Sequence, residues 1–254
     1  MSKLKGKIAI VTGGGSGIGE AISTLFAAEG AIVHILDLNI EGAFQVVNAI
    51  HQAGGLAQAH EVNVSDQQAV STLLVSIGQV DILVNNAGIA HVGSLEKCAG
   101  ADFDRVMNVN VKGAYNSLYA AVPLMKAQGG GTILNLASIA SVVGIADRFA
   151  YSASKGAIAA MTMSVARDYL KDQIRCNSIS PARVHTPFVD GFIAKNYPGM
   201  EDEMFEKLSQ SQPIGRMAKP IEIAKLALFL CSDDAGFITG NDYPIDGGFI
   251  KLNN

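Results

Sequence analysis

Cysteine is scarce in this sequence, and the cysteines that are present form no pattern. Cys98, Cys176 and Cys231 lie far apart, with no Cys-x-x-Cys pair. This spacing argues against both a disulfide framework and a zinc cluster. The five histidines never fall at the His-Glu-x-x-His spacing of a zinc site, so we expect no metal. The sequence therefore indicates a protein of a reducing compartment, the cytoplasm.

Charge is also sparse, and no region is strongly basic. Only 17% of the residues are charged, the formal net charge is −4, and the 19 lysines and arginines form no run. Binding to a nucleic-acid backbone needs a concentrated basic surface, so we expect no nucleic-acid partner. By contrast, 49% of the 254 residues are apolar. That composition predicts a compact globular protein with a substantial core rather than a disordered chain.

The sequence has no apolar run that reads as a membrane span. Its N-terminus starts with positive charge, but the apolar run covers only residues 8–11 before a glycine cluster. Residues 127–146 carry no charge, yet they include three consecutive glycines, Gln128 and Asn135. We interpret the first segment as a strand and the second as a buried strand with a loop, and we expect no membrane partner.

What the chain does contain is a regular alternation of short β-branched runs and longer segments of helical period. The predicted strands are residues 8–12, 32–36, 57–62, 82–85, 132–136, 174–179 and 243–245. The predicted helices are residues 17–29, 42–53, 67–77, 103–126, 151–170 and 221–231. This order predicts an α/β protein, a Rossmann-type doubly wound parallel sheet of about seven strands with helices on both faces. No linker or repeat interrupts the pattern, so residues 1–254 are expected to form a single domain.

A glycine-rich turn follows the first predicted strand, in the sequence TGGGSGIG at residues 12–19. Glycines let the backbone bend tightly and approach an anionic ligand, and the following helix N-terminus favours a phosphate. The strict Gly-x-Gly-x-x-Gly pattern is not met, and no Gly-Lys-Ser/Thr follows. A cofactor site and a purely structural turn both remain open on this stretch alone.

Asp37 ends the second predicted strand, twenty residues after Gly17. At this distance an acid meets the adenosine ribose of a nicotinamide cofactor. Such an acid accepts hydrogen bonds from the ribose hydroxyls and repels a 2′-phosphate, and no arginine follows in DLNIEG to bind that phosphate. The sequence therefore favours NAD (NADH) over NADP. The alternative role, a helix-capping aspartate, is compatible with this one.

Several motifs, in order and almost end to end, resemble the short-chain dehydrogenase/reductase family of the single-domain type. TGGGSGIG resembles the family's Thr-Gly-x-x-x-Gly-x-Gly turn, and NNAG at residues 85–88 resembles its fourth-strand motif. Asn110 in NVNVKG matches the helix asparagine, and Ser138 stands thirteen residues before Tyr151. Tyr151 and Lys155 form the family's Tyr-x-x-x-Lys, and IDGG at residues 245–248 resembles its last strand end.

The resemblance implies a set of cofactor-binding residues. They are Gly13, Ser16, Gly17, Ile18, Gly19, Asp37, Asn63, Val64, Asn85, Ala87, Gly88, Tyr151, Lys155, Val184 and Thr186. Thr186 matches the threonine expected near the nicotinamide carboxamide. Two departures bear on these contacts: Ala182 replaces the glycine of the family's Pro-Gly motif, and Asn63 stands where an aspartate is common.

The resemblance also implies the catalytic residues Asn110, Ser138, Tyr151 and Lys155. A free tyrosine has a pKa of about 10, too high for a base at neutral pH, so a neighbouring cation must stabilise its phenolate. Lys155, one helical turn along, is expected to do so and to bind the nicotinamide ribose. Ser138 would hydrogen-bond the substrate oxygen, and Asn110 would position a water that links the lysine to solvent. Singly, these residues could be a turn serine, a helix-bending asparagine and two neighbours on a solvated face.

Three functions are compatible with these residues. The first is an NAD-dependent alcohol dehydrogenase or ketoreductase. The second is a 3-oxoacyl-carrier-protein reductase, which would usually go with NADPH and with basic residues for its carrier protein; Asp37 argues against that cofactor. The third is a catalytically silent NAD-binding regulator, for which a missing tyrosine or lysine would be expected.

Two segments carry predictions beyond the chemistry. The helix at residues 151–170 is small and apolar on more than one face, which favours burial by a partner subunit, and the resemblance implies a homotetramer or homodimer. The alternative is burial within one subunit. Residues 187–213, the only long stretch outside the alternation, contain four aromatics and are expected to form a lid that closes over substrate. A static hydrophobic cover is the alternative.

The substrate is a small molecule, and its expected contacts are His91, Ser138, Arg148, Tyr151 and Arg183. Arg148 lies three residues before Tyr151, where many family members have an uncharged residue. A guanidinium holds a carboxylate through two hydrogen bonds, so the sequence predicts a small hydroxy acid or sugar-derived acid. The chain thus resembles members that oxidise 3-hydroxybutyrate and keto-deoxy acids. Alternatively, Arg148 faces solvent or pairs with an acid of the lid.

Overall fold

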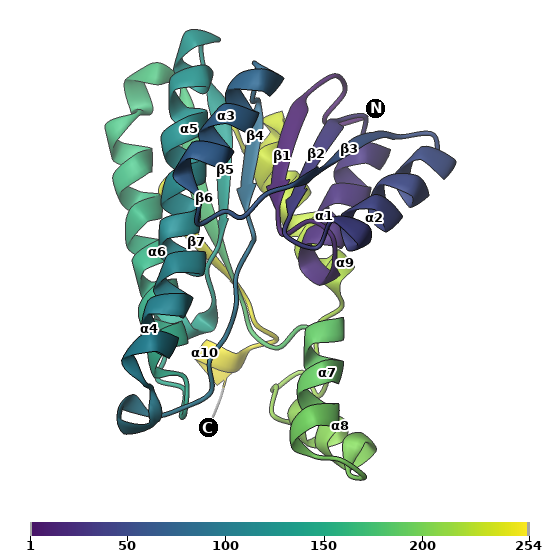
Figure 1. Ribbon diagram of the computed structural model, residues 1–254, viewed down its shortest axis with the longest axis vertical. Coiled ribbons are helices and arrows are strands. Elements are labelled where there is room, and N and C mark those ends of the chain that lie inside the picture. Colours follow the sequence, from purple (N-terminus) through teal and green to yellow (C-terminus); the bar gives the residue numbers. More distant parts are fainter. Residues whose placement is uncertain (1, 253–254) are drawn as a thin grey trace.

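The structure, a computed structural model, describes residues 2–252 and is built around one parallel sheet (Figure 1). The strands are β1 (Ile8–Thr12), β2 (Ile32–Asp37), β3 (Leu56–Glu61), β4 (Ile82–Asn85), β5 (Gly131–Leu136), β6 (Ile174–Pro181) and β7 (Asp242–Ile245). They lie in the order β3-β2-β1-β4-β5-β6-β7, and every neighbouring pair is parallel. The predicted doubly wound fold is thereby confirmed. Each predicted strand is present, with ends that differ by at most two residues.

Helices cover both faces of this sheet. The main helices are α1 (Gly17–Ala28), α2 (Ile40–Gln52), α3 (Gln67–Ile77), α4 (Gly100–Met107), α5 (Gly113–Ala127), α6 (Phe149–Asp168), α7 (Pro187–Asn196), α8 (Glu201–Gln210), α9 (Pro220–Cys231) and α10 (Phe249–Leu252). Single turns of 3-10 helix are Leu95–Lys97, Ile139–Ser141, Leu170–Asp172 and Asp233–Ala235. None of the helices described for residues 2–252 is long and apolar enough to cross a membrane.

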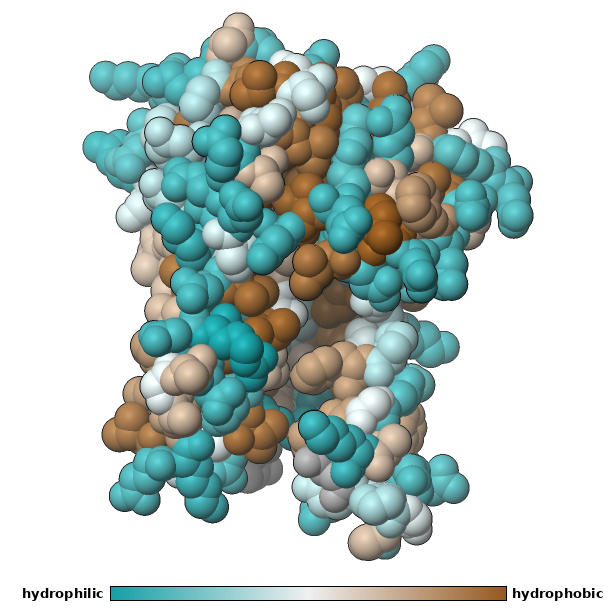
Figure 2. All heavy atoms as spheres, in the orientation of Figure 1, coloured by the Kyte–Doolittle hydropathy of each residue, from teal (hydrophilic) through white to brown (hydrophobic). Residues whose placement is uncertain are grey.

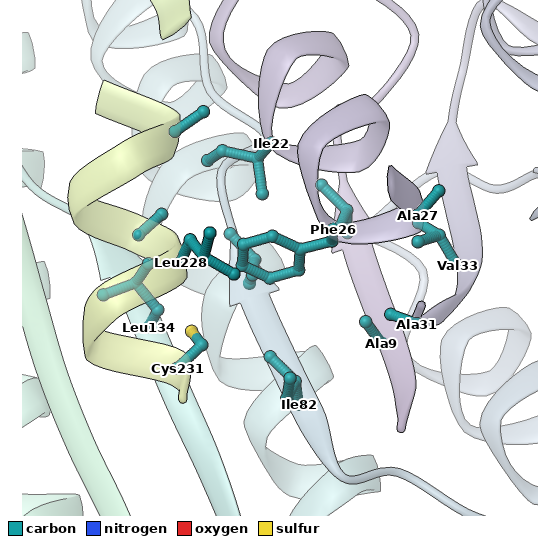
Figure 3. Close-up of a cluster of buried hydrophobic side chains, with 14 of the residues drawn as sticks. Ala9, Ile22, Phe26, Ala27, Ala31, Val33, Ile82, Leu134, Leu228 and Cys231 are labelled. Carbon is teal, nitrogen blue, oxygen red and sulfur yellow. The ribbon is translucent and has the colours of Figure 1, made fainter. Parts of the chain in front are cut away.

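Two hydrophobic clusters fill the space between the sheet and these helices. Successive residues of a strand face opposite sides of the sheet. Val33 of β2 therefore joins one cluster, and Leu36, three residues later, joins the other. In the first cluster, Phe26 of α1 is fully buried and lies between the sheet and Leu228 of α9 (Figure 3). The second cluster joins α3 and α5 on the opposite face, with Met125 fully buried. Burial on both faces explains the almost unbroken apolar character of the central strands.

The helix predicted over residues 103–126 differs in detail. It is a longer helical segment in which α4 and α5 are joined by a π-helical turn, Asn108–Lys112. A π turn inserts one extra residue into a helix and is common at functional sites. Asn110, one of the predicted catalytic residues, lies in this turn and is buried.

The sequence pattern placed residues 187–213 outside the regular alternation of strands and helices. In the structure, most of this segment forms the helices α7 and α8. The two helices pack on each other, and His185, which lies just before α7, makes an edge-on contact with Phe205 of α8. They stand apart from the sheet, beyond the ends of the central strands (Figure 1). The surface is hollowed between this helical pair and the rest of the molecule (Figure 2).

Candidate active site

The glycine-rich turn joins β1 to α1 and forms one wall of the hollow. Gly17 has a φ of +57°, a left-handed conformation that glycine adopts without strain. A Cβ atom on Gly19 would lie 2.1 Å from the carbonyl oxygen of Gly13, so only glycine fits there. Ser16 is the N-cap of α1, but its side chain makes no capping hydrogen bond. The first amides of α1 therefore suit an anionic group such as a cofactor pyrophosphate.

Asp37 stands at the end of β2, next to this turn. One carboxylate oxygen, Oδ2, accepts a 2.9 Å hydrogen bond from the Gly15 amide, and Oδ1 accepts another from the Asn39 amide at 2.9 Å. The N-cap of α2 is Asn39, whose side chain accepts from the Gly42 amide. The capping role that the sequence left open for Asp37 thus belongs to Asn39. Asp37 itself lines the hollow at the position that suits an adenosine ribose.

The hollow is a cavity of about 600 Å³. Sixteen of the predicted site residues line it: Gly13, Ser16, Gly17, Ile18, Asp37, Asn63, Val64, Ala87, Gly88, Ser138, Arg148, Tyr151, Lys155, Arg183, Val184 and Thr186. These residues come from the ends of six strands and from α1 and α6, so the fold brings together positions that are far apart in the sequence. Gly19, Asn85, His91 and Asn110 are not on its wall.

Ser138, Tyr151 and Lys155 meet at one end of the cavity. Ser138 follows β5, while the other two lie on α6, where Tyr151 forms a side-chain hydrogen bond with Ser138. The Lys155 ammonium donates a 2.6 Å hydrogen bond to the carbonyl oxygen of Leu136, and its Nζ lies 5.7 Å from the centre of the Tyr151 ring. An acid, a hydrogen-bonding hydroxyl and a cation thus share one small space.

Burial governs the protonation of this group. Burial raises the pKa of Tyr151 above its ordinary value, although the Ser138 hydrogen bond and the Arg148 charge act in the opposite direction. Burial also lowers the pKa of Lys155 to about 8. Ser138 and Arg148 thus lower the pKa of Tyr151, and the stabilisation of its phenolate by Lys155 stays a prediction. In this geometry Tyr151 keeps its proton at neutral pH and is ready to donate it.

Asn110 lies behind Lys155 and is held on all sides. Its Nδ2 donates to the Ile89 carbonyl and to Ser154 Oγ, both at 2.9 Å, and its Oδ1 accepts from the Ile89 amide at 2.8 Å. A second cavity of about 10 Å³ lies between Asn110, Lys155 and Asn85, enough for about one water. The Oδ1 atom of Asn85 is buried and makes no hydrogen bond. The expected water therefore has room, with Asn85 as an additional acceptor.

The predicted substrate residues separate into two groups. Arg148 and Arg183 line the main cavity, and neither forms an ion pair within residues 2–252. His91 does not line this cavity. Its Nε2 atom is 3.6 Å from a carboxylate oxygen of Asp102, and its Nδ1 atom is buried without a partner. The structure thus keeps both arginines together with Tyr151 and directs His91 elsewhere.

Some cavity residues escaped sequence reasoning. Ile145, Leu208, Met217 and Phe249 form apolar parts of the wall, and Phe249 comes from α10 near the end of the chain. Nothing in their local patterns distinguishes them from ordinary core or surface residues. Ser154 had a usable signal, because it lies three residues after Tyr151 on the same helix face; its Oγ donates to the Tyr151 carbonyl at 2.7 Å.

Comparisons with known proteins agree with this geometry. Residues 13–250 match a family model described as Enoyl-(Acyl carrier protein) reductase. The chain is 36% identical over 255 residues to cyclohexanol dehydrogenase of Acinetobacter sp. (strain SE19), which covers 98% of this chain and 97% of that protein. It is 33% identical over 252 residues to the 3-oxoacyl-(acyl-carrier-protein) reductase FabG of Thermotoga maritima, with 98% and 99% covered. The crystal structure of L-sorbose reductase from Gluconobacter frateurii, complexed with NADPH and L-sorbose, superimposes with a TM-score of 0.94 at 30% identity, over 99% of this chain and 100% of that one.

The chain belongs to the short-chain dehydrogenase/reductase family. It is an oxidoreductase of the type that acts on alcohol and ketone groups, and its fold binds a nicotinamide cofactor. The names of these three relatives give three different substrates: cyclohexanol, 3-oxoacyl-(acyl-carrier-protein) and L-sorbose. The substrate and the choice of cofactor therefore have to be argued from residues of this chain.

Proposed function

We propose that this protein is an NAD(H)-dependent dehydrogenase that interconverts a secondary alcohol and a ketone, with Tyr151 as general acid and base. One observation carries the proposal. Ser138, Tyr151 and Lys155 line the same cavity as the glycine-rich turn and Asp37, so a cofactor and a small substrate can meet in it. The intact Tyr-x-x-x-Lys argues against a catalytically silent regulator.

The residues divide the chemistry between them. A bound nicotinamide cofactor would supply the hydride acceptor for the alcohol and the hydride donor for the ketone. Ser138 donates a hydrogen bond to the substrate oxygen and holds it near the Tyr151 hydroxyl. Tyr151 donates its proton to that oxygen in reduction and takes it back in oxidation. Lys155 supplies a positive charge that favours the phenolate as it forms, and it would also bind the nicotinamide ribose.

NAD is the proposed cofactor because of Asp37. The cavity wall beside it consists of Leu38, Val62 and Asn63, which offer no positive charge to a 2′-phosphate. A carboxylate opposite a phosphate costs several kcal/mol, so we expect a preference for NAD over NADP of about 100-fold in kcat/KM. Asp37→Ser should shrink that preference at least tenfold. Equal use of both cofactors by the unmodified enzyme would contradict the assignment.

A small hydroxy acid or sugar-derived acid is the proposed substrate class. Arg148 lines the cavity near Tyr151, is half-buried, and has no carboxylate partner within residues 2–252. Its closest described contacts are the Asp147 carbonyl at 3.1 Å and the Phe192 ring at 5.9 Å. A substrate carboxylate on Arg148 would orient the neighbouring carbinol carbon toward Ser138 and Tyr151.

A direct experiment tests the reaction. Purified enzyme is assayed with NAD and with NADH against hydroxy acids, neutral secondary alcohols, sugars and acyl thioesters, together with Tyr151→Phe and Ser138→Ala. We expect turnover of hydroxy acids and a loss of at least about 1,000-fold in Tyr151→Phe, with NADH binding retained. Turnover that persists in Tyr151→Phe would exclude the proposed acid and base.

The specific alternative is a 3-oxoacyl-carrier-protein reductase, favoured by the 33% identity to FabG and by the family description. Such an enzyme would use NADPH and would reduce acetoacetyl thioesters faster than free oxo acids. Asp37 and the net charge of −4 speak against it. Measuring both substrates with both reduced cofactors separates the two functions.

We further propose that the enzyme is a cytoplasmic homotetramer. Met163 of α6 and Tyr119 of α5 are each 59% exposed, so both helices present large side chains to solvent. A second copy covering this face would remove that surface from water. Three free cysteines, two of them buried, agree with a reducing compartment. Residues 187–213 are proposed to act as the substrate lid.

A further inference from the structure

Two guanidinium groups face the substrate end of one cavity. Arg148 lies at the start of α6, and Arg183 follows β6, yet both line the cavity that holds Tyr151. Among the described residues that line the cavity, Asp37 is the only acidic one. It stands at the end of β2, and three strands separate β2 from β6 in the sheet. The substrate end is therefore cationic, with no carboxylate of its own.

Neither arginine is neutralised by the fold. Arg183 donates from Nε to Ser211 Oγ at 3.1 Å, which leaves the two terminal nitrogens of its guanidinium for a ligand. Arg148 donates one hydrogen bond to a backbone carbonyl and otherwise lies over an aromatic ring. Burial lowers the pKa of Arg183, and the Arg148 charge lowers it further. Two like charges held this close in a partly buried site favour an anionic ligand.

Both backbones are fixed from outside the helices and strands. Arg148 forms a parallel bridge with Gly93, in which the Gly93 amide donates to Asp147 at 2.9 Å. Asp147 adopts a φ of +56°, a strained conformation for a residue with a side chain. The Arg183 carbonyl accepts from the Ala218 amide at 2.9 Å. Such anchoring fixes the backbone positions from which the two arginine side chains extend into the cavity.

We propose that the substrate carries two acidic groups, one for each arginine: a hydroxydicarboxylate whose carbinol carbon lies between the carboxylates, or the corresponding oxodicarboxylate. Each guanidinium can bind one carboxylate through paired hydrogen bonds, and two carboxylates match the two charges. This inference rests on the proposed function. In oxidation the carbinol C–H bond breaks, its hydrogen and electron pair pass to the nicotinamide, and the O–H proton passes to the phenolate form of Tyr151. A C=O bond forms, and both carboxylates stay unchanged.

A matched substrate pair tests the idea. 3-Hydroxybutyrate and 3-hydroxyglutarate differ only in that the second compound has a carboxylate on its other arm. We expect kcat/KM for 3-hydroxyglutarate to exceed that for 3-hydroxybutyrate by about tenfold or more. Arg183→Gln should lower kcat/KM for the diacid about 10- to 100-fold and change that for the monoacid less than about threefold. Arg183→Lys, which keeps the charge, should recover part of the loss.

Controls and contrary outcomes are defined by the same assay. Arg105→Gln removes an exposed arginine outside the cavity and should leave both substrates unaffected. Equal or better use of the monoacid by the unmodified enzyme would overturn the proposal. A uniform loss in Arg183→Gln together with a raised KM for NAD would assign Arg183 to the cofactor instead, and would equally overturn it.

A binding measurement separates this inference from the proposed reaction. Glutarate has both carboxylates but no hydroxyl group, and butyrate has one carboxylate. Titration of the enzyme in the presence of NADH should show glutarate binding at least about tenfold tighter than butyrate, with the difference lost in Arg183→Gln. Glutarate selectivity without any turnover would refute the proposed dehydrogenase while supporting the two-anion site. Turnover of monoacids without tighter binding of glutarate would support the proposed dehydrogenase and refute the two-anion site.

Discussion

Lys155 is the residue in which function and stability oppose each other most directly. Its ammonium is buried, and burial lowers its pKa from an ordinary value of 10.5 to about 8. Between these two pH values the unfolded chain binds a proton that the folded protein does not, so folding becomes more favourable as the pH rises through this window. Below pH 8, the charged lysine costs up to roughly 3 kcal/mol.

We therefore predict that Lys155→Met abolishes activity and yet stabilises the fold at pH 7. Removing the buried charge should stabilise the folded state, and losing the hydrogen bond to the Leu136 carbonyl should cost about 1 kcal/mol of that stabilisation. The free energy of unfolding should then rise by about 1–2 kcal/mol. Denaturant unfolding of both proteins at several pH values provides the measurement. The advantage of the variant should be full below pH 8 and gone near pH 10.5. A less stable variant at pH 7 would mean that the ammonium is well solvated.

His34 supplies a second dependence on pH, away from the active site. Its ring stacks on His60 with centroids 5.2 Å apart, and their ring nitrogens lie 2.9 Å apart. Burial, followed by the His60 charge, lowers the pKa of His34 from 6.5 to about 4. As the pH falls from 6.5 to 4, the histidine is protonated in the unfolded chain before it is protonated in the folded protein. The contribution of neutral His34 to the free energy of unfolding is therefore complete above pH 6.5 and falls as the pH approaches 4.

The prediction is that His34→Leu loses less stability between pH 7 and pH 4.5 than the unmodified protein does. Denaturant midpoints at the two pH values measure it, with the exposed His185→Gln as control. If the unmodified protein and His34→Leu lose the same stability, the histidine pair does not titrate in this window.

At the same scale, sequence reasoning succeeded where local order sets the geometry. Tyr151 and Lys155 are one helical turn apart, so their proximity follows from the helix alone. It failed for His91, whose side chain turns toward Asp102 of a following helix, a contact that no local pattern encodes. Arg148 and Arg183 were both named as substrate contacts, although their shared cavity depends on the packing of α6 against β6, which no local pattern encodes.

Among the elements, α7 and α8 are the helical pair that lines one side of the cavity. Phe188 and Phe192 of α7 and Leu208 of α8 line the cavity, while Phe188 is 63% exposed. An exposed aromatic ring at a cavity wall gains contacts if the helices move toward the substrate. We expect the pair to close when cofactor and substrate are bound.

Limited proteolysis measures this closure. Cleavage near Tyr197–Met200, the connection between α7 and α8, should slow at least severalfold with NAD plus substrate and much less with NAD alone. A substrate-independent cleavage rate would identify the pair as a static cover. Phe188→Ala should raise KM for the substrate while leaving KM for NAD unchanged.

The strands and most helices could be predicted because burial on the sheet imposes a periodic apolar pattern. The helices α7 and α8 could not be predicted in this way, since they pack on each other and line the cavity rather than packing on the sheet. The α8 sequence EDEMFEKLSQ has only three large apolar residues, and α7 contains Gly191, a poor helix former. The π turn around Asn110 was also missed, because one inserted residue barely alters a helical pattern.

For the whole molecule, the exposed face of α5 and α6 carries the prediction of assembly. The rings of Tyr115 and Tyr119 contact each other at a tilt, with their centres 5.8 Å apart, and Met163 is exposed on α6. Replacing Tyr119 and Met163 together by glutamate would place charge in a closed interface, which costs several kcal/mol. We expect sedimentation to show a tetramer for the unmodified protein and a smaller species for the double variant. A monomer at micromolar concentration in the unmodified protein would contradict the assembly.

The cavity that runs from Asp37 to Phe249 also imposes an order on catalysis. We expect the cofactor to occupy the part of the cavity that borders the sheet, and the substrate to lie between the nicotinamide and the helical pair α7 and α8. Substrate that arrives first would block the route of the larger molecule, so NAD should bind first and NADH should leave last. With this order of binding and release, kcat should approach the rate of NADH release. It should then be nearly the same for all good alcohol substrates, whereas kcat/KM should still distinguish them. Product inhibition by NADH should then be competitive with NAD, and inhibition by the ketone should not be.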